Sequence, residues 1–89
     1  MESGTVVFSK AGKDKRKPFI VLYTEDGYAF LADGRLRPLH KPKKKKMKHI
    51  QPTNTVIADL KQKIENKQYM NDADIKKALL PYQTESQGG

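Results

Sequence analysis

The order of hydrophobic and polar residues divides the chain into two halves that predict different secondary structure. In the first half, short runs of β-branched and aromatic residues are separated by turn-forming residues such as Pro18 and Glu25-Asp26-Gly27. Such runs predict strands, and Asp33-Gly34 favours a tight hairpin because glycine tolerates a positive φ. The pattern predicts five short strands, with a lysine-rich segment before the last, at residues 5–9, 19–23, 28–32, 35–37 and 47–50.

The second half of the chain has helical periodicity. Asn54 or Thr55 can cap the start of a first helix, since both side chains accept hydrogen bonds from free backbone N–H groups. The apolar residues that follow recur at helical spacing and share one face, namely Val56, Ile57, Leu60 and Ile64. The change of pattern at Pro52 therefore predicts a helical segment after the strands.

A break near Asn71 precedes a second short helix. Its first turn holds Asp72 and Asp74, whose carboxylates oppose the positive end of the helix dipole. We expect Pro81 to end this helix. The predicted organisation is mainly β with C-terminal α: a small bent sheet or barrel over residues 1–53 with a basic segment at 35–49, a helical extension over 54–82 that packs on it, and a disordered tail over 83–89.

The whole net charge of +8 is concentrated in one block. From Gly34 to Ala58 the chain holds eight basic residues and no Asp or Glu, whereas residues 1–33 and 59–89 each balance five basic residues with five acidic ones. A smaller basic cluster lies at residues 10–17, between the first two predicted strands. Two basic segments beside a small sheet can form one surface, and the commonest partner of such a directed positive field is a polyphosphate backbone.

The sequence holds few groups that could carry catalysis or bind a metal. It has no cysteine, hence no disulfide or thiolate metal site, and no G-x-S-x-G nucleophile motif. His40 and His49 lie among lysines whose ammonium groups would repel a divalent cation. No apolar run approaches the roughly 18 residues needed to cross a bilayer. We expect a cytoplasmic, monomeric, non-enzymatic protein with no cofactor, metal, small-molecule substrate or membrane partner.

The lysine run of residues 41–49 can also be interpreted without a binding surface. Runs of like charge are often solvated loops that repulsion keeps extended. Short lysine-rich segments also match nuclear-import signals by accident. Either interpretation would explain one basic cluster alone, but two clusters beside one sheet favour a binding surface.

Three successive segments resemble a KOW motif, which consists of a strand, a basic glycine loop and a second strand. They are Gly4-Thr5-Val6-Val7-Phe8, Ala11-Gly12-Lys13-Asp14-Lys15 and Phe19-Ile20-Val21-Leu22. The continuation to His49-Ile50-Gln51-Pro52-Thr53 is similar to small bacterial KOW-domain proteins, which are relatives of large-subunit ribosomal proteins of archaea and eukaryotes. The resemblance covers about residues 3–58. It implies an SH3-like β-barrel that contacts RNA through the loop at residues 10–17 and adjacent basic segments.

One position departs from the family pattern. The loop often reads G-x-D-x-G-K in the family, and here Arg16 replaces the second glycine. If this position needs a positive φ, the arginine is strained by roughly 1 kcal/mol or more. Otherwise the loop takes another path and the arginine adds a phosphate contact. We expect Arg16 to point outward and to cost little stability.

The prediction is an RNA-binding protein whose target is structured, ribosomal RNA. Lysines act as flexible point charges, so they would recognise backbone and shape more than bases. The expected RNA-binding residues are Lys10, Gly12, Lys13, Lys15, Arg16, Lys17, Arg35, Arg37, His40, Lys41, Lys43, Lys44, Lys45, Lys46, Lys48 and His49. Tyr23, Tyr28 and Phe30 can stack on bases, but their strand-like surroundings favour places in the barrel core or wall.

The alternative function is a protein-docking SH3-like module that acts as an accessory factor of translation or transcription. The docking surface would then be formed by the apolar helix residues Leu60, Ile64, Ile75 and Leu79. A chain this short can bury only a small core. We therefore expect these residues to close the open end of the barrel instead.

Overall fold

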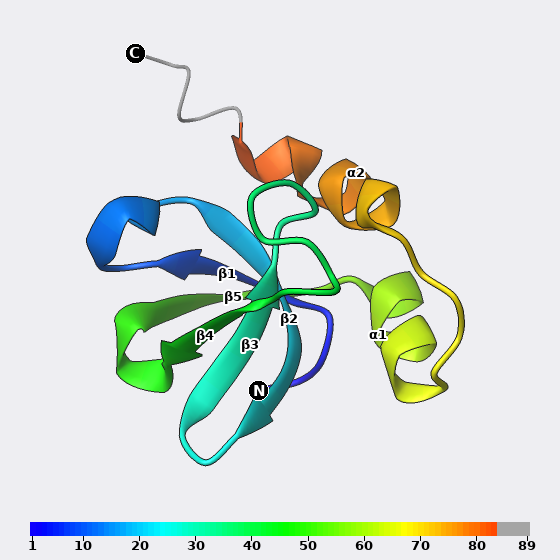
Figure 1. Cartoon of the computed structure of the whole chain (residues 1–89), viewed down its shortest axis with the longest axis horizontal. Helices are drawn as coiled ribbons and strands as arrows, with labels where there is room; N and C mark the ends of the chain where they lie inside the picture. The colour runs from blue at the N-terminus through cyan, green and yellow to red at the C-terminus, as the bar shows by residue number, and fades with distance from the viewer. Residues whose placement is uncertain (84–89) are drawn as a thin grey trace.

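The computed structural model describes residues 1–83 as a five-stranded antiparallel sheet followed by two helices (Figure 1). The strands are β1 (Thr5–Ser9), β2 (Pro18–Glu25), β3 (Tyr28–Ala32), β4 (Lys43–Lys46) and β5 (Ile50–Val56). The helices are α1 (Ala58–Glu65) and α2 (Asp72–Gln83), and the short 3-10 helices are η1 (Gly12–Asp14) and η2 (Met47–His49). The prediction of a mainly β chain with C-terminal helices is confirmed.

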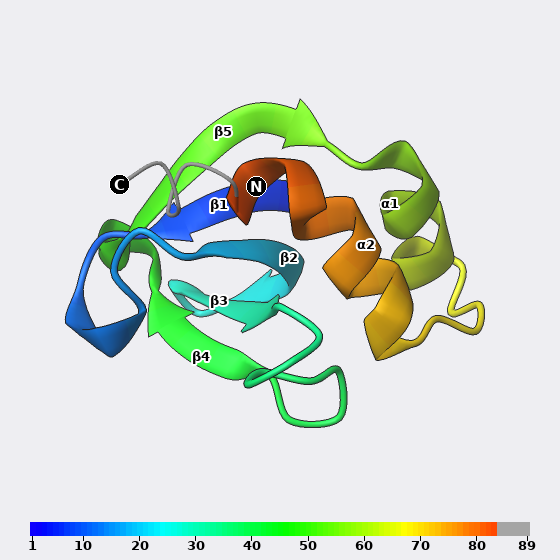
Figure 2. The same cartoon turned by 90° about the horizontal axis from the view of Figure 1, so that it is seen from above.

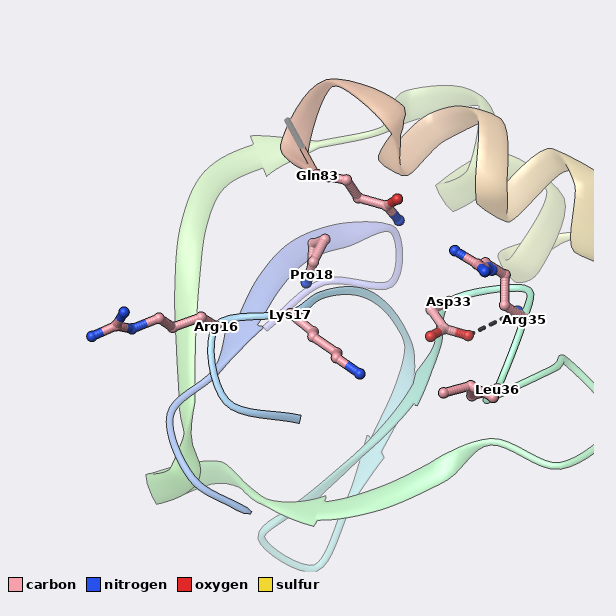
Figure 3. Close-up of a pocket in the computed structure, with 7 residues that line it drawn as sticks. All are labelled: Arg16, Lys17, Pro18, Asp33, Arg35, Leu36 and Gln83. Atoms are coloured by element: carbon pink, nitrogen blue, oxygen red, sulfur yellow. Dashed lines mark hydrogen bonds between the residues drawn. The ribbon is translucent and has the colours of Figure 1, made fainter. Parts of the chain in front are cut away.

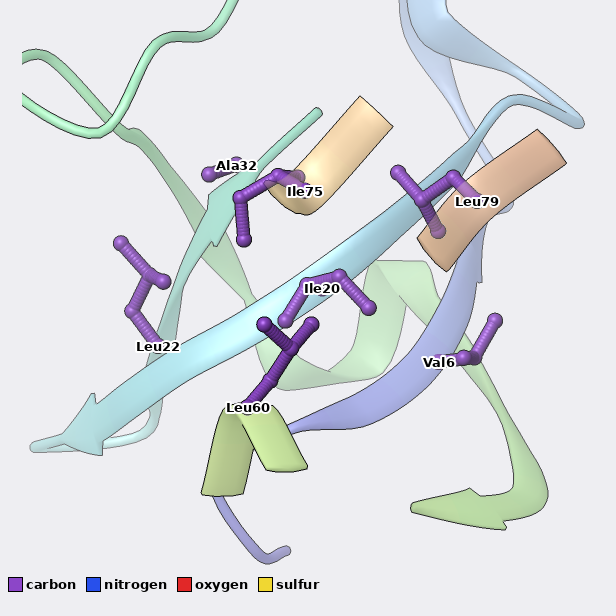
Figure 4. Close-up of a cluster of buried hydrophobic side chains, with 7 residues drawn as sticks. All are labelled: Val6, Ile20, Leu22, Ala32, Leu60, Ile75 and Leu79. Atoms are coloured by element: carbon purple, nitrogen blue, oxygen red, sulfur yellow. The ribbon is translucent and has the colours of Figure 1, made fainter. Parts of the chain in front are cut away.

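Both faces of the sheet are buried where β1 and β2 run side by side. Successive side chains of a strand point to opposite faces. One face packs against the helices through Val6, Ile20, Leu22, Ala32, Leu60, Ile75 and Leu79 (Figure 4). The other face, inside the curl of the sheet, is filled by Val7, Phe19, Val21, Ala29, Leu31 and Ile50. Burial on both faces explains why consecutive positions are apolar in the middle of β1 and the first part of β2.

The sheet has the strand order β4-β3-β2-β1-β5 and curls strongly (Figure 2). The register shifts between Val21 and Tyr23 of β2, and between Thr5 and Val7 of β1. Such bulges bend a strand and increase its twist. The edge strands β4 and β5 follow each other through η2, yet within residues 1–83 they do not pair with one another. The sheet is therefore curled but not closed.

The fourth strand lies at a different place from the predicted one. Residues 35–37 are in a loop, because the Asp33 carboxylate accepts hydrogen bonds of 2.8 Å from the backbone N–H groups of both Arg35 and Arg37. A side chain bonded to its own downstream backbone holds a turn in place of a hairpin strand. The lysine run, for which no strand was predicted, forms β4 and pairs with β3. This pairing satisfies the backbone groups along the outer edge of β3.

The strand expected at residues 47–50 is the 3-10 helix η2, and β5 follows it as far as Val56. Two bonds hold this stretch against the N-terminal strand: Thr53 Oγ1 donates to the Val6 carbonyl at 2.7 Å, and the Ile57 N–H donates to the Gly4 carbonyl at 2.9 Å. The backbone stays extended through the positions where a helix was expected to begin. Consequently α1 starts at Ala58 and not at residue 54 or 55.

Helix α2 begins after Asn71, as predicted. The Asp74 N–H donates to Asn71 Oδ1, and the Asn71 N–H donates to Asp74 Oδ2, both at 3.0 Å, which makes a reciprocal cap. The helix continues past Pro81 to Gln83, contrary to the prediction. Tyr82 packs edge-to-face on the Phe8 ring with 6.4 Å between centroids, and this contact holds the last turn. The rest of the predicted tail, residues 84–89, lies outside the described part of the chain.

The segment before β1 is tied to α1 by an ion pair. The Lys61 ammonium donates a hydrogen bond to the Glu2 carboxylate. This hydrogen bond, together with the attraction between the charges, lowers the pKa of Glu2 and raises the pKa of Lys61. Both ends of the sheet-forming segment are thereby attached to the helical extension.

Candidate nucleic-acid interface

The loop between β1 and β2, residues 10–17, folds back on itself and presents its cations outward. The Arg16 N–H donates to the Ser9 carbonyl at 2.7 Å, and the Lys17 N–H donates to the Asp14 carbonyl at 2.9 Å. Gly12 opens the 3-10 turn with a φ of +78°. The backbone N–H groups of Arg16 and Lys17 thus have hydrogen-bond acceptors in or next to the loop. Five basic side chains are left exposed: Lys10, Lys13, Lys15, Arg16 and Lys17.

A buried carboxylate connects this loop to the second basic segment. Asp14 is only 8% exposed, and its Oδ2 lies 3.5 Å from Arg37 Nη2 and 4.0 Å from Lys43 Nζ. Beside it, Lys45 Nζ donates a hydrogen bond of 3.1 Å to the Ala11 carbonyl. These contacts attach β4 and the loop before it to residues 10–17. The two basic clusters, well separated in the sequence, therefore lie side by side and form what we call the basic surface.

The lysines of β4 alternate between two roles, because successive residues of a strand face opposite sides. Lys43 and Lys45 are half-buried. The Lys43 ammonium group pairs with Asp14, and the Lys45 ammonium group donates a hydrogen bond to the Ala11 carbonyl. Lys44 and Lys46 are exposed on the other face. The interpretation of this run as a solvated loop is wrong. Two of its four lysines hold the adjacent loop, and the other two remain available to a ligand.

A cleft of about 350 Å³ opens between the loop at residues 10–17 and the loop after β3 (Figure 3). Its lining residues are Arg16, Lys17, Pro18, Asp33, Arg35, Leu36 and Gln83. The Lys17 side chain extends into the cleft, whereas Arg16 points away from it. Lys17 and Arg35 place two positive charges in the lining against the single carboxylate of Asp33, which also accepts hydrogen bonds from backbone N–H groups. The cleft can hold an anionic group such as a phosphate.

Four other predicted residues lie around these elements. Lys48 in η2 is exposed, and the His49 carbonyl accepts a 2.8 Å hydrogen bond from the Lys10 N–H, which keeps both beside residues 10–17. His40 and Lys41, in the loop between β3 and β4, are also exposed. The Leu39 N–H donates to Asp72 at the start of α2 at 2.7 Å. This bond ties the loop between β3 and β4, which holds His40 and Lys41, to the start of α2 (Figures 1 and 2).

An aromatic row of Tyr23, Phe30 and Tyr28, the three rings that the sequence offered for base stacking but favoured as barrel core or wall, lies beside the exposed lysines of β4. Tyr23 and Phe30 are register partners on β2 and β3, and their rings stack with 4.4 Å between centroids. Lys44, the partner of Phe30 on β4, places its ammonium 4.6 Å from the centroid of the Tyr28 ring. None of these three rings belongs to either buried cluster among residues 1–83. In the sequence, Tyr28 and Phe30 alternate with Ala29 and Leu31. This alternation indicates that the two rings share the strand face opposite to the buried Ala29 and Leu31.

Arg16 adopts a φ of +71°, which is the left-handed region that favours glycine. The first alternative for this departure therefore holds: the position requires a positive φ. The side chain does point outward, as expected (Figure 3). The expectation that it costs little stability is revised, because a non-glycine residue in this region loses about 1 kcal/mol.

Replacing Arg16 by glycine should raise the free energy of unfolding by about 1 kcal/mol, since the strain disappears. The matched control is Arg16→Ala, which removes the same charge and keeps the strained backbone. Urea denaturation measures both. We expect the glycine variant to be more stable than the alanine variant by about the same 1 kcal/mol. Equal stability of the glycine and alanine variants would contradict the strain.

No helix among residues 1–83 is both long and apolar enough to span a membrane. The same residues contain no group of three or more His, Cys, Asp or Glu side chains placed to hold a metal ion. None of the protein-family models matches this chain, and a search of curated proteins likewise gives no match.

Proposed function

We propose that this protein is a non-enzymatic RNA-binding protein of the KOW type that contacts structured, ribosomal RNA in the cytoplasm. A curled sheet of five short antiparallel strands, whose edge strands β4 and β5 are joined by the 3-10 helix η2, supports an SH3-like barrel. The loop at residues 10–17 is the element through which the KOW resemblance implies RNA contact. Its five exposed cations support that role.

The proposal rests on one observation: the basic surface is assembled by specific internal contacts. Asp14 pairs with Arg37 and Lys43, and Lys45 bonds the Ala11 carbonyl. Charges that merely kept a protein soluble would have no need to be brought together against their mutual repulsion. A concentrated positive field is favourable when a polyphosphate neutralises it.

Recognition would be mostly of the RNA backbone. The deep, narrow major groove of A-form RNA is closed to side chains, so lysines contact phosphates and 2′-hydroxyl groups from outside. Such contacts set position and affinity but carry little sequence information. We expect similar affinities for different paired RNAs and a strong dependence on salt.

The test is a salt series with a paired ribosomal RNA fragment. If the basic surface neutralises about five phosphates, log affinity should fall with log salt at a slope of roughly −3.5 to −4.5. The double variant Lys44→Gln/Lys46→Gln removes two exposed cations and should flatten the slope by about 1.5. The fold should survive, because neither ammonium belongs to an ion pair among the described residues.

The matched control is Lys67→Gln/Lys77→Gln, which removes the same charge from exposed positions of the helical part. Its slope should stay close to that of the wild type. If the β4 variant and the control behave alike, the charge effect is not local and the basic surface is not the binding site. Sedimentation with ribosomal particles at low and at high salt then tests the target. A wild-type protein that sediments alone at low salt would move the protein-docking function ahead.

A further inference from the structure

The aromatic row of Tyr23, Phe30 and Tyr28 lies on the sheet face that the helices cover only in part. Ala32 and Leu22, on the same face, are buried under α1 and α2. The face continues toward the β2–β3 turn, which projects away from both helices (Figure 1). Tyr23 is 46% exposed there, stacked on Phe30 on one side only. One ring face is therefore left to solvent.

Fold stability alone does not account for these rings. The β2–β3 turn is already made by Asp26 and Gly27 with positive φ values, and the core is filled without the aromatic row. A bulge at Leu22 brings Tyr23 onto the face of Phe30, where strict alternation would have pointed it into the curl beside Val21. The bulge thus places Tyr23 on the same face of the sheet as Phe30 and Tyr28.

The row has positive charge on one side and negative charge on the other, an arrangement that can orient the phosphate of a nucleotide. On the β4 side, Lys44 lies 6.0 Å from the Phe30 centroid, and Lys46 is the register partner of Tyr28. On the turn side, Glu25 is the other register partner of Tyr28, and Asp26 follows it. A phosphate is attracted to the β4 side and repelled from the turn side. A base stacked on Tyr23 would therefore have its backbone running along β4.

We propose that this row is a stacking platform for an unpaired base of the bound RNA, with Lys44 and Lys46 on the phosphates of that nucleotide. The inference rests on the proposed function and deepens it. Every base has a π-face, so stacking on an exposed aromatic ring requires no particular sequence. Bases in a duplex are already stacked, and only loops, bulges or ends can present one. The protein would thus prefer RNA with an unpaired segment beside a helix.

The experiment compares two RNA probes of equal length and charge: a hairpin with a pyrimidine loop and a fully paired duplex. Tyr23→Ile keeps a high strand propensity and removes the π-face, whereas Tyr23→Phe keeps the ring and serves as the conservative control. Tyr69→Ala is a second control, because this ring is 81% exposed outside the sheet. Thermal melting verifies that each variant is folded.

We expect Tyr23→Ile to weaken binding of the hairpin about tenfold and to leave duplex binding unchanged. Tyr23→Phe and Tyr69→Ala should bind both probes like the wild type. The protein has no tryptophan. Hairpin binding should therefore quench tyrosine fluorescence, and that part of the quenching should be absent in Tyr23→Phe.

The outcomes separate this inference from the proposed function. If the wild type binds neither RNA, the proposed function fails. If the wild type binds both RNAs and Tyr23→Ile weakens neither, or weakens both equally, the stacking platform is overturned while RNA binding stands. A folded Tyr23→Ile variant that loses affinity for the hairpin alone supports it.

Discussion

Replacing Gly34 by alanine is expected to lower the free energy of unfolding by about 3 kcal/mol. Gly34 has a φ of +79°, and a Cβ there would lie 2.4 Å from the backbone oxygen of Asp72 and 2.8 Å from Lys76 Cγ. The first turn of α2 therefore packs directly on the Gly34 backbone. An added methyl group must push the helix away from the loop at Gly34. The positive φ, unfavourable for alanine, lowers stability further.

The matched control for this change is Gly27→Ala. Gly27 has a similar φ of +82°, but a Cβ there meets nothing within 4 Å. Its loss should be about 1 kcal/mol, from backbone strain alone. Urea denaturation monitored by circular dichroism measures both variants. If the two alanine variants lose equal stability, the close contact between Gly34 and α2 is not present in solution.

Truncating Ile75 to alanine should cost about 3 kcal/mol. Ile75 of α2 is fully buried and packs with Leu79 and Leu60 against Ile20 of the sheet. Removing its side chain loses apolar burial and leaves a cavity, because the sheet and α1 hold the surrounding residues in place. For a domain of this size such a loss is a large part of the total stability.

Leu80→Ala is the control for this truncation. Leu80 follows Leu79 on the same helix but is 60% exposed. Its truncation should therefore change stability by no more than about 0.5 kcal/mol. Thermal and urea unfolding distinguish the two variants. Similar losses would mean that α2 is not docked as the structure has it. Three of the four residues that a protein-docking function would use, Leu60, Ile75 and Leu79, would then be free to contact a partner.

The strands β1, β2 and β3 were predictable because their pattern is local. Runs of β-branched and aromatic residues between turn-forming residues specify strands whatever the partner is. The fourth strand was not predictable in this way, because four consecutive lysines have no strand pattern. They become extended because β3 has an open edge to pair, and because like charges already favour an extended backbone.

The location of the basic surface was predictable from charge alone, since residues 10–17 and the lysine run stand out in the sequence. The contacts that hold this surface together could not be predicted. The motif placed Asp14 in the loop, but no local pattern shows that it is buried and holds Arg37 and Lys43. An ion pair between residues so distant along the chain depends on the fold and has no local signal.

By itself the sequence determined three things about this protein: a β-rich first half, a helical second half, and a net positive charge gathered in one block. These follow from residue types and their spacing, which act over a few residues. Only the tertiary structure decided which lysines of β4 are exposed and where Tyr23 points. Both depend on register, and a single bulge at Leu22 or a shift of one residue in β4 reverses every side chain that follows.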